Sequence, residues 1–183
     1  MCIRDRARTL HEAAQAGDHV EPNLAAASLR VVASSGDGSD YDAIVEGYRS
    51  AATPQAEMRY LGALLRFDDA DLFERTLQLL TDEVRTQNAP FLLAAAMGHL
   101  DHGPRAWELV TRRWDELNQR FPANSIPRML GGVRSLSTPE LAADVAAFLA
   151  EHPVPQGALT VAQHLEKLTV NVELRAREGK SFA

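Results

Sequence analysis

Cysteine is almost absent from this sequence, because Cys2 is the only one among 183 residues. A single cysteine excludes an internal disulfide framework and is typical of a reducing compartment, so we expect a cytoplasmic protein. No apolar run approaches the roughly 20 residues that a membrane-spanning helix needs. No charged and then apolar start resembles a signal peptide. We therefore expect no membrane partner.

Positive charge is also in short supply. Lys and Arg total 19 residues against 25 Asp and Glu residues, which leaves a net charge of −6. Where four arginines gather, between residues 105 and 120, three acidic residues share the same expected helix. This arrangement predicts a mixed, solvated face and not the basic stripe of a nucleic-acid-binding protein. We expect no nucleic-acid partner.

Strand patterns are absent as well, because no segment alternates polar and apolar residues at period two. The sequence instead predicts an all-α fold, in which several helices carry a proline in the first turn after a capping residue such as Thr53 or Thr138. At the second of these helices, Ser137 and Glu140 offer a competing capping box that would start the helix one residue before the Thr138 cap. The expected helices cover residues 5–16, 22–34, 40–51, 54–67, 70–81, 89–100, 104–121, 126–136, 139–151 and 159–178.

The segment 84–121 carries the most specific pattern in the chain. Asn88 is placed to cap a helix with Pro90 in its first turn, and a second helix begins at Gly103-Pro104. Five apolar residues then recur at steps of three and four, so they share one face that must be buried. Trp107 and Trp114 could instead form a stacking platform for a base or a peptide ring, but the apolar residues beside them favour core packing. The five are Trp107, Val110, Trp114, Leu117 and Phe121.

Two histidine-containing segments raise the question of a metal site. In the string HEAAQ at 11–15, Gln15 stands where a second histidine is needed, and a neutral amide cannot replace an imidazole as a zinc ligand. The alternative is the polar face of a surface helix. His99 and His102 are three residues apart with only Asp101 beside them, which favours a loop or helix-end role over metal binding. We expect no metal ligands and no catalytic residue in this chain.

Four segments together resemble a known family. They read VRTQN at 84–88, AWELVTRRWDEL at 106–117, SIPRMLGGVRSLSTPELAADVAAFLAEHPVP at 125–155 and AQHLEKLTVNVELRARE at 162–178. In order and spacing they resemble the C-terminal helical domain of the aminopeptidase-N-type zinc aminopeptidases, which include the endoplasmic-reticulum trimming aminopeptidases. The resemblance is strong over residues 58–178 and closest to bacterial cytosolic members.

The resemblance and the spacing of the helices imply the same architecture. A two-helix unit recurs about every 30 to 37 residues, within the range of helical-repeat arrays. We expect an α-solenoid of antiparallel helix pairs, a right-handed superhelix of the HEAT or armadillo kind, over residues 7–183. The last helix agrees, because Val161, Leu165, Leu168 and Val172 form a stripe while Asn171 points outward. Residues 1–6 have no counterpart in the family and are expected to be a non-native tail.

The family's chemistry lies outside this chain. Its members hold zinc with a His-Glu-x-x-His helix and a further Glu, and they anchor the substrate's amino terminus with a Gly-x-Met-Glu-Asn loop. Neither motif is present here. The resemblance therefore implies an inactive part of a zinc aminopeptidase, whose catalytic domain would hold the zinc. This part would enclose the peptide substrate and contact that catalytic domain.

Within the family this domain curves over the catalytic domain, so polar residues on its concave side can meet the distal end of a peptide. The candidates for substrate contact are Arg85, Gln87, Arg128 and Gln163. Arg85 could grip a peptide carboxylate, or it could bind carbonyl groups at the end of the preceding helix. A free-standing helical-repeat adaptor is the competing hypothesis, which a polar first helix would favour. An exposed apolar strip there would favour truncation from a larger enzyme.

Overall fold

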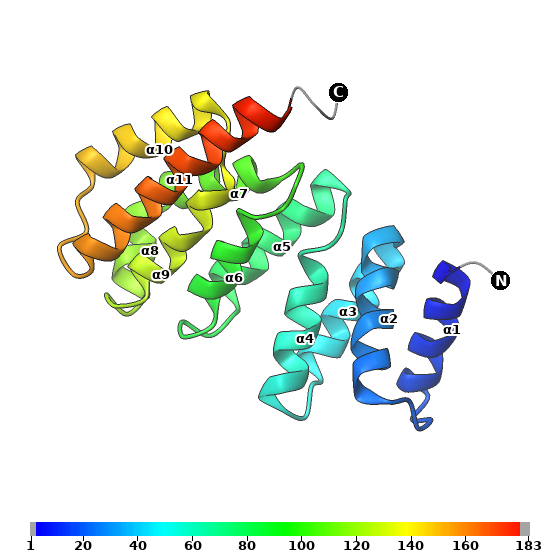
Figure 1. The fold of residues 1–183 in the computed structure, drawn as a ribbon. Coiled ribbons are helices and arrows are strands. Elements are labelled where there is room, and N and C mark those ends of the chain that lie inside the picture. The colour runs from blue at the N-terminus through cyan, green and yellow to red at the C-terminus, as the bar shows by residue number, and fades with distance from the viewer. Residues whose placement is uncertain (1–2, 180–183) are drawn as a thin grey trace. The chain divides into compact units, whose positions relative to one another are not determined.

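The computed structural model describes residues 3–179 as eleven α-helices and one 3-10 helix, with no strand in that range (Figure 1). The all-α expectation is confirmed. The chain divides into two compact units, Met1–Thr76 and Leu77–Ala183. The superhelical arrangement and the single domain over residues 7–183 stay predictions.

The first unit is built from consecutive helices that pack on their neighbours. α1 begins at Ile3, so residues 3–6 of the expected tail are helical, while residues 1–2 lie outside the described part of the chain. Thr53 caps α4 as expected, because its hydroxyl accepts the amide of Ala56 at 3.2 Å. The helices are α1 (Ile3–Gln15), α2 (Pro22–Ser35), α3 (Gly38–Arg49) and α4 (Pro54–Leu64), and α5 (Ala70–Asp82) contains the division between the units.

Tyr41 lies at the centre of the first unit. Its ring meets the edge of Phe67 at a centroid distance of 5.3 Å, and the Arg75 guanidinium lies 4.5 Å from the ring centroid on its face. The buried Thr76 hydroxyl donates to the Tyr41 hydroxyl at 3.2 Å, so the phenol is satisfied inside the core. The surrounding buried side chains are Leu29, Val32, Ala33, Ile44, Leu61, Leu64 and Phe73.

An ion pair joins α1 to α3. Arg8 donates from both terminal nitrogens to the two carboxylate oxygens of Asp40, at 2.8 and 2.9 Å. This bond from Arg8 is the main reason why the pKa of Asp40 lies below its ordinary value. Because the pKa is lower in the folded state, the pair stabilises the fold above about pH 4, and the contribution is lost as the pH falls through the folded pKa.

We expect Arg8→Ala to lower the free energy of unfolding at pH 7 by about 0.5–1 kcal/mol, since half of the Arg8 side chain is solvent-exposed and the pair is screened. The deficit should shrink steadily below about pH 4. Urea unfolding of both proteins across this pH range tests the prediction. Arg4→Ala, on the same helix, is the control and should change stability little. A deficit independent of pH would contradict the proposed role of the Asp40 charge.

The second unit corrects two expected helices. The helix expected at 104–121 is interrupted at Arg113, which ends α7 and precedes α8. The helix expected at 126–136 is a single α-turn followed by a 3-10 helix, because Gly132 packs directly on the backbone of Ala94 and glycine favours α-helix poorly. The elements are α6 (Ala89–Ala96), α7 (Gly103–Arg112), α8 (Trp114–Arg120), α9 (Ile126–Met129), η1 (Leu130–Ser135), α10 (Pro139–Glu151) and α11 (Ala158–Glu178).

Two capping predictions have different outcomes. Asn88 precedes α6 as expected, but its side chain makes no capping hydrogen bond, because its backbone is already in the helical region. Thr138 is the cap of α10, because its hydroxyl accepts the amide of Leu141 at 3.3 Å. The competing box led by Ser137 therefore does not set the start of this helix.

The apolar stripe of α7 and α8 is buried, as expected, and it packs against α10. Phe148 presents its ring to both indoles, with centroid distances of 5.4 Å to Trp107 and 5.3 Å to Trp114. The indole nitrogen of Trp107 donates to Asp144 at 2.6 Å. Core packing of the two tryptophans is confirmed, and a stacking platform for a ligand is excluded.

The helices α6, α9 and α11, with η1, form the other side of the second unit (Figure 1). η1 lies between α6 and α11 and contacts both. The stripe of α11 faces this layer, with Val161 and Leu168 buried. Asn171 was expected to point outward, but it is half-buried and donates to the Arg134 carbonyl at 2.8 Å, because η1 approaches α11 closely at this point.

Within residues 3–179, no helix has both the length and the apolar character needed to cross a membrane.

Candidate functional site

The histidines of both segments make contacts that shape the local structure. His99 Nδ1 accepts the backbone amides of Asp101 and His102, at 3.3 and 3.2 Å, so the ring shapes the loop after α6. His11 Nε2 lies 2.9 Å from the side-chain amide nitrogen of Gln15, and burial lowers the pKa of His11. Among the described residues, no three His, Cys, Asp or Glu side chains are grouped to hold a metal ion. Cys2 lies outside that range.

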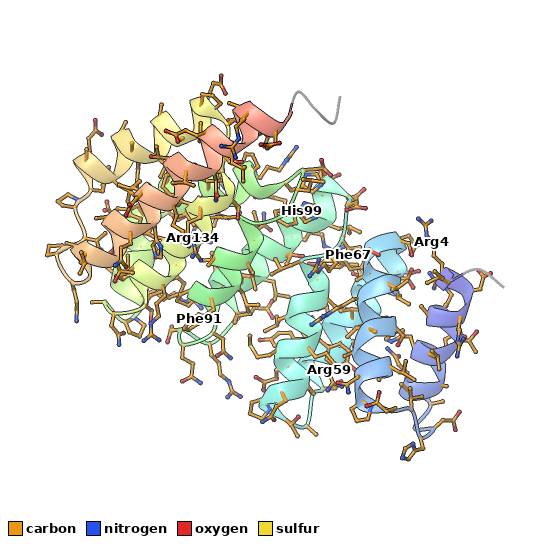
Figure 2. The ribbon with its side chains drawn as sticks, in the orientation of Figure 1. Arg4, Arg59, Phe67, Phe91, His99 and Arg134 are labelled. Atoms are coloured by element: carbon orange, nitrogen blue, oxygen red, sulfur yellow. The ribbon has the colours of Figure 1, made fainter. Side chains whose placement is uncertain are left out.

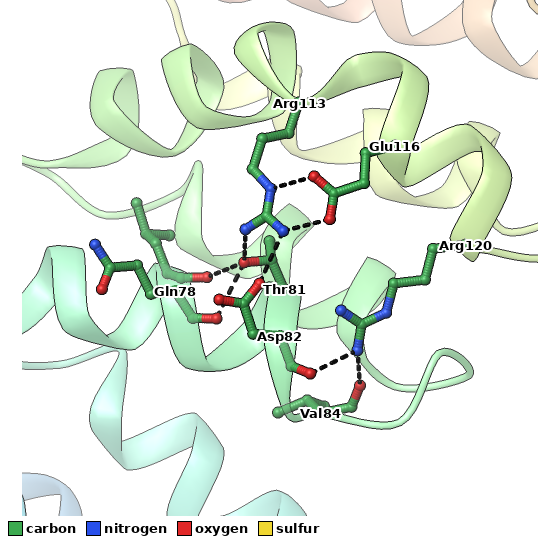
Figure 3. A network of polar contacts seen from close by, with 8 residues as sticks. Gln78, Thr81, Asp82, Val84, Arg113, Glu116 and Arg120 are labelled. Carbon is green, nitrogen blue, oxygen red and sulfur yellow. Dashed lines mark hydrogen bonds and ion pairs between the residues drawn. The ribbon is translucent and has the colours of Figure 1, made fainter.

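Arg85 and Gln87 lie in the loop between α5 and α6, where both side chains are exposed. The carbonyl groups at the end of α5 are bound by Arg120, which donates to Asp82 and Val84 at 3.2 Å each (Figure 3). This is the kind of contact that we expect of Arg85 as the alternative to gripping a carboxylate, and the role of Arg85 itself stays a prediction. The sequence did not reveal Arg120, which is 36 residues from Val84 and looked like part of a solvated face.

Arg113 fixes the same end of α5 from the junction of α7 and α8. It donates to the Thr81 hydroxyl at 2.6 Å, to Asp82 at 2.8 Å and to both oxygens of Glu116 (Figure 3). These bonds lower the pKa of Asp82 and of Glu116 and raise the pKa of Arg113. The network therefore holds the helix end from which the loop with Arg85 and Gln87 projects.

A groove runs over the layer formed by α6, η1 and α11, with a volume of about 890 Å³. Its lining includes five small residues and two half-exposed apolar side chains, Phe91 and Leu174. The small residues are Ala94, Ala95, Gly98, Gly131 and Gly132. Of these, Ala95 and Gly98 are exposed, so an extended chain could approach the backbone of the helix end closely at this point.

Four cations line this groove. Figure 2 labels Phe91 and Arg134, which come from α6 and η1. The Arg128 guanidinium lies 5.7 Å from the Phe91 ring centroid, and Arg134 donates from Nε to the Gly131 carbonyl at 2.7 Å. The other two cations, Lys167 and Arg175, come from α11.

A second hollow of about 510 Å³ adjoins the groove and shares Arg134, Lys167 and Asn171 with it. Gln163 and His164 line it. His164 Nε2 lies 3.1 Å from the Pro127 carbonyl, and burial lowers the pKa of its imidazole. The bond connects α11 to α9.

The structure thus brings Arg128 and Gln163 to two adjoining hollows, while Arg85 and Gln87 lie together on a separate loop. Sequence reasoning missed Arg134, Lys167 and Arg175. The sequence shows these cations and Arg128 near the two ends of the segment 128–175. Only the packing of η1 on α11 brings the two ends together into one groove.

Comparison with known proteins identifies the family of this chain. Residues 2–170 match the family model described as the ERAP1-like C-terminal domain. The chain belongs to this family. The match covers nearly all of both compact units and begins within the expected tail.

Several aminopeptidases are similar to this family member. Aminopeptidase M1-C of rice (Oryza sativa subsp. japonica) is 31% identical over 75% of this chain and 16% of its own length. Aminopeptidase M1 of Arabidopsis thaliana is 28% identical over 76% of this chain and 16% of its own length. The alanine/arginine aminopeptidase of Saccharomyces cerevisiae is 27% identical over 85% of this chain and 19% of its own length. The chain thus spans less than one fifth of the length of these relatives, and its expected likeness to bacterial members stays a prediction.

Proposed function

We propose that this chain is the substrate-enclosing C-terminal domain of a zinc aminopeptidase that removes amino-terminal residues from peptides in the cytoplasm. The observation that carries the proposal is the match of residues 2–170 to the family model, together with the aminopeptidases among the relatives. A catalytic domain outside this chain would hold the zinc, which polarises the scissile carbonyl and activates water. The chain itself would line part of the space that encloses the peptide.

Polar residues of the second unit could contact the peptide. Arg128 and Gln163 line adjoining hollows, and Arg85 and Gln87 project from a loop that Arg113 and Arg120 hold in place. We propose that these residues lie beyond the reach of a short peptide bound at the zinc, so that only long peptides contact them. A short substrate ends before it arrives, because an extended chain advances only about 3.3–3.6 Å per residue.

The adaptor hypothesis has some support in the first unit. The exposed face of α1 is mainly polar, with Arg4, Arg6 and Glu12, which is the feature expected of an adaptor. Ile3 and Leu24 are nevertheless exposed apolar residues on α1 and α2, which is the feature expected beside a further domain. An adaptor would bind its partner without influencing peptide hydrolysis, so an activity measurement distinguishes the two functions.

The test is a chimaera in which this chain replaces the corresponding domain of the yeast alanine/arginine aminopeptidase. We expect Arg85→Ala to lower kcat/KM about fivefold for a peptide of about ten residues, as the loss of one exposed charged contact. A single-residue reporter substrate should be hydrolysed at an unchanged rate, because it cannot reach this domain. Arg30→Ala, on an exposed position of α2, is the matched control.

One result would contradict this role of Arg85, and another would contradict the enclosing function. If Arg85→Ala changes the two substrates equally and also lowers the free energy of unfolding of the isolated chain by about 1–3 kcal/mol, the residue serves to hold the loop. If the chimaera hydrolyses long and short substrates at the same rates as a version lacking this chain, the enclosing function itself is wrong.

A further inference from the structure

The groove over α6, η1 and α11 concentrates positive charge in a chain whose net charge is −6. Its described lining carries four cations and one acid, Glu178, which gives a local charge of +3. Glu178 is already paired with Arg177, from outside the groove, at 2.7 Å. We propose that this groove binds an acidic segment of about four residues in the distal part of the peptide substrate, through two or more side-chain carboxylates.

The cations are available to such a segment. Lys167 and Arg175 are exposed and form no ion pair with any residue in the described range. Arg128 has the face of Phe91 beside it, and Arg134 uses its Nε on a carbonyl, so the terminal nitrogens of both can still donate. Guanidinium groups bind carboxylates with two parallel hydrogen bonds, which suits arginine to this role.

The spread of the charges argues for several carboxylates in place of one. Lys167 and Arg175 are eight residues apart on one helix, which separates their backbone positions by about 12 Å at 1.5 Å per residue. A single terminal carboxylate could therefore reach only one end of the groove. An extended segment of about four residues spans this length, since it advances about 3.3 Å per residue.

The remaining lining fits the backbone and one apolar side chain of the segment. Ala95 and Gly98 are exposed in the lining and leave room for a peptide backbone, whereas Gly131 is buried and a Cβ atom added there would already be in van der Waals contact with His164 Nε2, at 3.5 Å. Phe91 and Leu174 are 45% and 46% exposed and offer apolar surface at the groove. The segment best matched to this surface combines acidic residues with an apolar one.

That the bound peptide is a substrate rests on the proposed function. The binding itself can be measured on the 183-residue chain alone. The probe is a fluorescent peptide, Glu-Leu-Glu-Glu, with an amidated carboxyl end. We expect fluorescence anisotropy to show binding that weakens as salt is raised, because the contacts are exposed. The analogue Gln-Leu-Gln-Gln, also amidated, should bind at least tenfold more weakly.

The double variant Lys167→Ala, Arg175→Ala should weaken binding of the acidic probe about tenfold, since each exposed charge pair contributes about a threefold effect. Arg66→Ala, Arg105→Ala removes the same charge from exposed positions outside the groove and should leave binding nearly unchanged. Circular dichroism spectra of the variants establish that both remain folded.

Three results would overturn the proposal. The first is the absence of saturable binding of the acidic probe at low salt. The second is that the two double variants weaken binding of the acidic probe equally. The third is that Gln-Leu-Gln-Gln with a free carboxyl end binds as tightly as the acidic probe, which would assign the groove to a terminal carboxylate. The enclosing function can fail separately. If the acidic probe binds the groove but the chimaera shows no dependence on peptide length, the groove is correct and the substrate role is not.

Discussion

Replacing Trp114 with alanine is expected to lower the free energy of unfolding by about 3–5 kcal/mol, the range measured for the truncation of buried aromatic residues. The indole is 8% exposed and meets the edge of Phe148 at 5.3 Å and the His152 ring at 6.1 Å. Its removal leaves a cavity between α8 and α10, and the edge-to-face contact with Phe148 is lost as well.

Urea unfolding followed by circular dichroism measures this loss, because the substitution removes one of only two tryptophans and would alter the fluorescence signal. Leu100→Ala is the control: Leu100 is 92% exposed, so its truncation should change the free energy by less than about 0.5 kcal/mol. An unchanged denaturation midpoint for Trp114→Ala would show that the indole is not part of the core.

The buried stripe containing Trp114 could be predicted from sequence, whereas the interruption beside it could not. The apolar residues on either side of Arg113 keep helical spacing, so the periodicity gives no sign of a break. The break accompanies tertiary contacts of the Arg113 side chain with Thr81 and Asp82, about 30 residues earlier in the chain. Side chains that interact over such separations are invisible to a pattern that compares residues three or four apart.

The groove was only partly predictable for the same reason. Arg128 and Gln163 were selected because the segments around them resemble a family, not because the sequence indicates that they lie near each other. Arg134 is separated by 37 residues from Asn171, whose side chain binds its carbonyl, and this contact places η1 beside α11. The cations of η1 and α11 therefore form one patch only after the two elements have packed.

Gly132 decides how closely η1 approaches α6. A Cβ atom at this position would lie 2.5 Å from the carbonyl oxygen of Ala94 and 2.8 Å from its Cα atom. Both are backbone atoms, which cannot move away by a simple change of rotamer. We expect Gly132→Ala to lower the free energy of unfolding by about 2–3 kcal/mol, because overpacking of this kind forces the backbone to shift.

Gly131→Ala is a control within the same 3-10 helix, because a Cβ atom there would have its nearest neighbours at 3.5 and 3.6 Å, which is ordinary contact. Urea unfolding of both variants should therefore separate a large loss at Gly132 from a small change at Gly131. Equal losses would indicate that the glycines matter for backbone conformation and not for close packing. Since Ala94 and Gly132 both line the groove, the shift forced by Gly132→Ala should also weaken binding of an acidic peptide, even though the substitution removes no charge.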